Sequence, residues 1–181
     1  MDSKDWEQVD LFIQKRFPLP AFTNIKHGHL SVLDIRPHVP QKILDSYYKF
    51  TFIRNPYDRF VSSCFFLFAA REAFAQNPVG FMKKLLKQDK ELPLMFRPQL
   101  SYIENPIDSN NSFMDFHGDF EYLQRDFDKV CTELKLPLQQ LEILNTTKHD
   151  NLETYYDEEL KQLVQDRYRA DLKLYQSIQN R

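Results

Sequence analysis

Glycine is scarce in this sequence, with 3 residues among 181. A loop that wraps a phosphate with its backbone amides usually needs glycine, and the GxxxxGK[ST] motif of nucleotide kinases and related hydrolases is absent. Cysteine is as rare. Cys64 and Cys131 stand far apart and form no CxxC pair. They allow one disulfide at most, and we expect two reduced thiols.

The sequence also lacks an excess of charge and a long apolar run. It carries 24 Lys and Arg against 26 Asp and Glu, a net charge of −2. This balance excludes a generally basic protein that coats nucleic acid, but it leaves room for a local basic pocket. No run reaches the roughly 18 apolar residues of a membrane span, and the N-terminus resembles no signal peptide. We therefore expect a soluble, cytoplasmic chain.

The length fits one domain over residues 1–181, since about 150 residues per domain is the usual prior. Hydrophobic spacing predicts helices over five stretches: 3–16, 55–74, 79–88, 120–134 and 155–178. A shorter helix is expected over 40–45, and another, interrupted by Pro98, over 94–104.

Two segments rich in β-branched and aromatic residues predict strands, one over 48–53 and one over 112–116 that ends before Gly118. Residues 21–47 are otherwise expected to be irregular, because Pro37 and Pro40 interrupt them. The alternation of strand and helix indicates the α/β class, with more helix than strand.

The most informative segment begins where the first strand ends. Arg54, Asn55 and Pro56 follow it at once. Asn is a favoured N-cap and Pro suits the first helical position, so the strand is expected to turn directly into a helix. Helix N-termini attract anions, an Arg adds a two-pronged donor, and Ser62 adds a hydroxyl. This pattern predicts an anion site; the alternative is a surface turn with solvated arginines.

Residues 54–62 follow the pattern Arg-x-Pro-x-x-Arg-x-x-Ser throughout. This segment resembles the 3′-phosphate-binding motif of sulfotransferases that use 3′-phosphoadenosine 5′-phosphosulfate (PAPS). It is most similar to the carbohydrate branch that includes heparan sulfate 2-O-sulfotransferase. The resemblance implies that Arg54 and Ser62 bind the 3′-phosphate. It also implies a three-layer, helix-rich α/β domain on a short, mostly parallel sheet, of the nucleotide-kinase-like (P-loop-like) class.

The resemblance runs from about residue 25 to 176 and includes His27-Gly28-His29. It implies that His29, or His27 as its alternative, takes the proton from a hydroxyl acceptor, which suits a neutral imidazole. It also places Lys148 in a late loop that closes on the nucleotide, where a solvated loop is the alternative. The His pair could instead bind a metal with His38, but this spacing is a weak zinc pattern, and we expect no metal.

The chain departs from the family at one point. The 5′-phosphosulfate loop, roughly Pro-Lys-x-Gly/Ala-x-Thr-Ser/Thr, is not found in the sequence. The chain is then either a fragment or a shortened relative, and we expect it to transfer sulfate poorly by itself. The function implied is sulfuryl transfer from PAPS to a carbohydrate hydroxyl. The alternative is a non-catalytic module that keeps only the 3′-phosphate half-site. The resemblance also implies the Golgi lumen as an alternative compartment, if an upstream anchor is missing.

Overall fold

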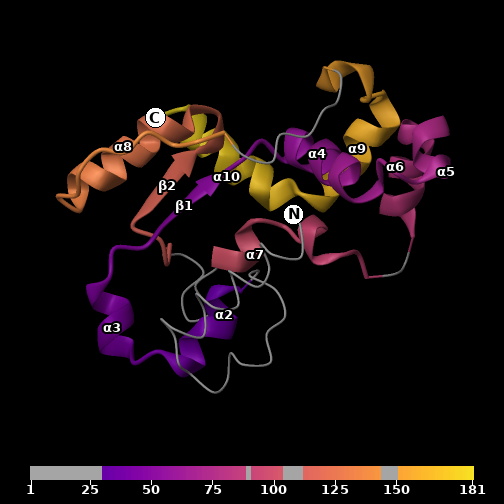
Figure 1. The fold of residues 1–181 in the computed structure, drawn as a ribbon. Helices are drawn as coiled ribbons and strands as arrows, with labels where there is room; N and C mark the ends of the chain where they lie inside the picture. The colour runs from indigo at the N-terminus through magenta and orange to yellow at the C-terminus, as the bar shows by residue number, and fades with distance from the viewer. Residues whose placement is uncertain (1–29, 89–90, 104–111, 144–150) are drawn as a thin grey trace. The chain divides into compact units, whose positions relative to one another are not determined.

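The computed structural model describes residues 30–88, 91–103, 112–143 and 151–181 (Figure 1). They belong to two compact units. The smaller is the described part of Met1–Tyr48 and Tyr102–Phe113, and the larger is that of Lys49–Ser101 and Met114–Arg181. The helix expected over 3–16 lies outside the described residues. The single domain over 1–181 stays a prediction.

The smaller unit is more helical than its prolines suggested. Helix α2 (Val32–Ile35) begins at Ser31, whose hydroxyl and backbone form a reciprocal capping box with Asp34. A 3₁₀ turn, η2 (Arg36–His38), follows, and α3 (Gln41–Ser46) confirms the short helix expected over 40–45. The irregular conformation expected over 21–47 is therefore wrong for residues 32–38. Pro37 lies in the first turn of η2, where proline is tolerated.

The larger unit contains strand β1 and the first group of helices. In chain order these are β1 (Phe50–Ile53), α4 (Pro56–Phe68), α5 (Glu72–Gln76) and α6 (Pro78–Lys87). The helix expected over 55–74 ends at Phe68. The turn after it brings Phe74 back against α4, where its ring lies 4.9 Å from that of Phe65 and 6.4 Å from that of Phe68. Aromatic packing therefore decides where α4 ends.

The remaining elements alternate short turns with helices, and all of them lie in this unit except the end of the helix over 100–103, since Tyr102 belongs to the smaller unit. They are η3 (Leu94–Phe96), α7 (Leu100–Ile103), β2 (Phe116–Asp119), η4 (Phe120–Tyr122), α8 (Leu123–Glu133), η5 (Leu152–Thr154), α9 (Glu158–Arg167) and α10 (Arg169–Gln179). Pro98 separates η3 from α7, as expected. The helix expected over 155–178 is instead broken at Tyr168, whose φ and ψ of −111° and 27° are not helical.

Strands β1 and β2 pair in parallel, with Phe52 opposite Gly118 and Ile53 opposite Asp119 (Figure 1). The second strand thus runs through Gly118, and the expectation that it occupies 112–116 is wrong. Glycine fits there because a Cβ at this position would lie 2.5 Å from the ring of Phe52. The helix-rich α/β class with a parallel sheet is confirmed. Both strands end at the same edge of the sheet.

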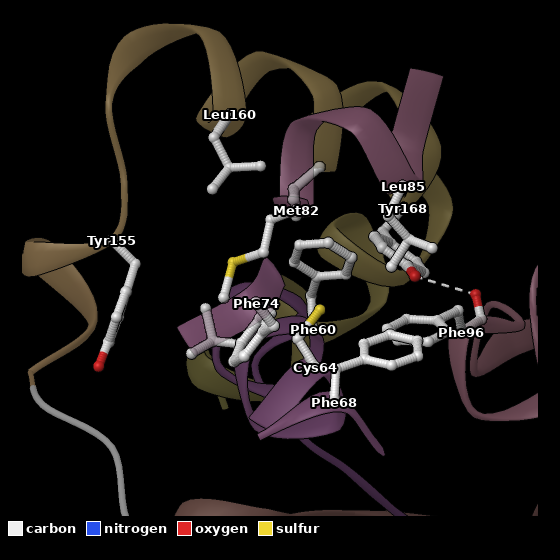
Figure 2. Packing of buried hydrophobic residues seen from close by; sticks show 12 residues of the cluster. Phe60, Cys64, Phe68, Phe74, Met82, Leu85, Phe96, Tyr155, Leu160 and Tyr168 are labelled. Atoms are coloured by element: carbon white, nitrogen blue, oxygen red, sulfur yellow. Dashed lines mark hydrogen bonds between the residues drawn. The ribbon is translucent and has the colours of Figure 1, made fainter. Parts of the chain in front are cut away.

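The main core joins α4, α6 and α9 around aromatic rings (Figure 2). Phe60 is 1% exposed, and its ring lies 5.7 Å from that of Phe96. The break at Tyr168 buries that side chain in the same cluster, where its hydroxyl donates to the Phe96 carbonyl at 2.9 Å (Figure 2). Cys64 and Cys131 are both buried and free, as expected. Burial raises the pKa of the Cys64 thiol, which keeps it protonated.

We predict that Tyr168→Phe lowers the free energy of unfolding by about 1–2 kcal/mol, because it leaves the buried Phe96 carbonyl without this donor. Urea unfolding of the two proteins measures the change. Tyr122→Phe is the control. Tyr122 is 52% exposed, so water can satisfy any group that its hydroxyl contacts once the hydroxyl is removed. If both variants lose the same amount, the buried bond is not the cause.

Candidate functional site

The candidate site lies where β1 turns into α4. The side-chain oxygen of Asn55 accepts a hydrogen bond from the Tyr57 amide at 3.0 Å and caps the helix. Pro56 is the first residue of α4. The sharp strand-to-helix turn predicted from these residues is therefore confirmed. It places Arg54 beside the first turns of a 13-residue helix.

The side chain of Arg54 lies along α4 and reaches Ser62. Its Nη1 donates to the Ser62 hydroxyl at 3.2 Å, and its Nε donates to the Asp58 carboxylate. Eight residues correspond to about two turns of helix, so the spacing in the sequence becomes proximity in space. The Arg54 side chain is 26% exposed, and Ser62 is buried. A guanidinium has five N–H donors, and these contacts with described residues use two.

Two residues distant in the sequence also fix Arg54. The Phe120 ring, just after β2, lies 5.0 Å from the guanidinium carbon and makes a cation–π contact. The Gln99 carboxamide forms hydrogen bonds with both the amide and the carbonyl of Arg54. The nearby Arg59 donates to the Met95 carbonyl at 2.9 Å.

The end of β2 is secured by a network of buried carboxylates. Asp126 on α8 accepts the Asp119 amide, Arg125 Nε and Lys129 Nζ, each at 2.8 Å. Burial alone would raise the pKa of Asp126, but these hydrogen bonds outweigh it and hold the pKa well below its usual range. Asp119 in turn accepts a hydrogen bond from Gln179 at the end of α10. These groups line a pocket of about 380 Å³ beside β2.

The remaining candidates from the sequence are placed as follows. His27, His29 and Lys148 lie outside the described residues, so the structure brings together Arg54 and Ser62 alone of the proposed set. His38 ends η2 in the smaller unit. Within the described ranges, no group of three His, Cys, Asp or Glu side chains could hold a metal ion. The helices described there are all too short or too polar to cross a membrane.

The whole chain was compared with known proteins. The family model described as the sulfotransferase family matches residues 14–176. A relative from Archaeoglobus fulgidus, described as an uncharacterized protein, is 30% identical over 118 residues, which is 65% of this chain and 92% of the relative. No solved structure matches the chain. The family match covers the strand-to-helix turn, β2 and all the helices described above except the end of α10.

The network at Asp126 predicts a pH dependence. Its pKa is lower in the folded chain, so the unfolded chain takes up the proton first as the pH falls, and stability is lost below about pH 4. Asp126→Asn should lower the free energy of unfolding by about 2 kcal/mol at pH 7, and the difference from wild type should shrink toward pH 3. Urea unfolding between pH 7 and pH 3 measures it.

Asp128→Asn on the same helix is the control, because among the described residues the Asp128 carboxylate accepts one hydrogen bond, from Gln124. It should follow the wild type across this range. An Asp126→Asn protein whose stability differs from wild type by the same amount at every pH would contradict the prediction.

Proposed function

The chain belongs to the sulfotransferase family, and on that premise we propose that it transfers a sulfuryl group from PAPS to a carbohydrate hydroxyl. The family implies a sulfotransferase function and hence a sulfate donor. In the proposed reaction the acceptor oxygen forms a bond to sulfur. The bond from sulfur to the 5′-phosphate oxygen breaks, and adenosine 3′,5′-bisphosphate leaves with that electron pair.

The observation that carries the proposal is the contact between Arg54 and Ser62 at 3.2 Å. A guanidinium beside the start of a helix, together with a hydroxyl about two turns along it, forms a donor set that suits a phosphate dianion. The set lies at the carboxyl edge of a parallel sheet, where ligands of α/β folds commonly bind. In this proposal Arg54 and Ser62 donate to the 3′-phosphate, and the Phe120 ring packs against the guanidinium.

The resemblance in the sequence supplies the rest of the proposed machinery. His29 takes the proton that the acceptor hydroxyl loses, with His27 as the alternative base. Lys148 closes on the nucleotide from a late loop. The remaining catalysis is positioning and stabilisation of charge, as in phosphoryl transfer.

Arg54→Ala should weaken binding of adenosine 3′,5′-bisphosphate by about 10- to 150-fold, because a charge-assisted hydrogen bond is worth about 1.5–3 kcal/mol. Ser62→Ala should cost less, about 0.5–1.5 kcal/mol, as a neutral donor. Isothermal titration with this nucleotide and with adenosine 5′-phosphate measures both.

The matched control is Arg169→Ala, since the Arg169 side chain is 69% exposed on α10 and pairs with Asp166. It should leave both affinities unchanged. Equal affinity of the wild type for the two nucleotides would remove the 3′-phosphate from the proposal.

In a chain that carries the 5′-phosphosulfate loop, His29→Ala should lower turnover by about 10²–10⁴-fold and leave nucleotide affinity nearly unchanged, since a general base acts on the acceptor rather than on the nucleotide. Transfer of labelled sulfate from PAPS to a panel of glycans measures turnover, and titration measures affinity. Full turnover in His29→Ala with loss in His27→Ala would move the role to His27. Nucleotide binding without turnover in the wild type would favour the non-catalytic alternative.

A further inference from the structure

The backbone of Arg54 occupies a position that neither neighbouring element supports. It follows Ile53, the last paired residue of β1, and precedes the cap of α4. A residue at such a junction must find other partners for its amide and carbonyl. Here Gln99 supplies both. Its Nε2 donates to the Arg54 carbonyl at 2.9 Å, and its Oε1 accepts the Arg54 amide at 3.1 Å.

Gln99 is itself held by a buried carboxylate. Asp171 on α10 is 0% exposed. Its two oxygens accept hydrogen bonds from the backbone amide of Gln99 at 2.7 Å and from that of Leu100 at 2.9 Å. A buried carboxylate that accepts two backbone amides fixes the segment that carries them. The chain of contacts therefore runs from α10 through Gln99 to the backbone of Arg54.

This series of hydrogen bonds determines the position of the Arg54 guanidinium. The Arg54 side chain points along α4 to Asp58 and Ser62 only while its backbone keeps its present direction. If the peptide at Arg54 rotates, the guanidinium leaves Ser62, and the two donors no longer converge on one anion. Site geometry must be held within about half an ångström for full effect.

We propose that Gln99, fixed by Asp171, is a positioning residue that aligns Arg54 with Ser62 and so sets the affinity of this site for a nucleotide 3′-phosphate. The inference rests on the proposed function. In this proposal Gln99 acts through Arg54 and does not itself contact the substrate. Its effect is confined to the part of the affinity that depends on the 3′-phosphate.

The test is Gln99→Met, which keeps the length of the side chain and removes both hydrogen bonds to Arg54. Isothermal titration of the full chain is carried out with adenosine 3′,5′-bisphosphate and with adenosine 5′-phosphate. We expect affinity for the bisphosphate to fall about tenfold, because a misaligned Arg54 loses part of its charge-assisted contact with the 3′-phosphate. Affinity for the monophosphate should stay within about twofold.

The matched control is Gln124→Met. Gln124 on α8 also bridges two backbone groups, donating to the Gln139 carbonyl at 3.0 Å and accepting the Leu141 amide at 2.8 Å. Like Gln99, it donates to one backbone carbonyl and accepts one backbone amide, and neither belongs to Arg54; it also donates to the Asp128 carboxylate. Its loss should leave both nucleotide affinities unchanged. An equal fall in Gln124→Met would assign the effect to general loosening of the fold and overturn the proposal.

A second variant covers the case in which Gln99→Met does not fold. Gln99→Asn keeps the carboxamide but is one methylene shorter and cannot reach both backbone groups. It should show the same selective loss, smaller than that of Gln99→Met. If the wild type prefers the bisphosphate and the folded Gln99 variants keep the full preference, the positioning role is wrong while the proposed function stands. If the wild type shows no preference, the proposed function fails first.

Discussion

The buried carboxylate of Asp171 is the interaction on which the end of β1 depends. A carboxylate withdrawn from water is unfavourable unless donors surround it, and here the donors are the backbone amides of Gln99 and Leu100. Burial raises the pKa of Asp171, while these two amides oppose that rise. The favourable arrangement of the carboxylate is thus the same one that brings Gln99 to Arg54. Stability of α10 and order at the site are coupled through one side chain.

Polar side chains of helix α10 also hold the end of β2. Asp171, Tyr175 and Gln179 are spaced by four residues and so share one face of the helix. Tyr175 donates to the Glu121 carboxylate at 2.6 Å, and Gln179 donates to Asp119. This face of the helix thus carries polar side chains that hold two segments distant in the sequence, residues 99–100 and residues 119–121. The carboxyl ends of both strands, where Arg54 and Phe120 meet, are fixed by the same helix.

Local signals in the sequence predict the strand-to-helix turn and the proximity of Arg54 and Ser62. They do not predict the contacts that hold the backbone of Arg54. Asn55 and Pro56 predict the strand-to-helix turn from adjacent residues, and helix periodicity brings Ser62 to Arg54. The contacts from Gln99 and Asp171 join residues 45 and 72 positions apart. The pattern of apolar residues does not predict such contacts, since an Asp within a helix usually lies on its solvated face. The polar spacing along α10 was the one signal that could have pointed to them.

The pairing of Arg54 with Asp58 bears on how such a site can select its ligand. The carboxylate offsets the charge of the guanidinium, so the pair presents little net charge to an approaching anion. Attraction at long range is then weak, and binding relies on hydrogen bonds that require a defined direction. Asp58, in the first turn of α4, is also favourably placed against the helix dipole. Alignment of donors, rather than positive charge, is therefore what the proposed site offers a phosphate, which is why the backbone of Arg54 must be held from outside its own strand and helix.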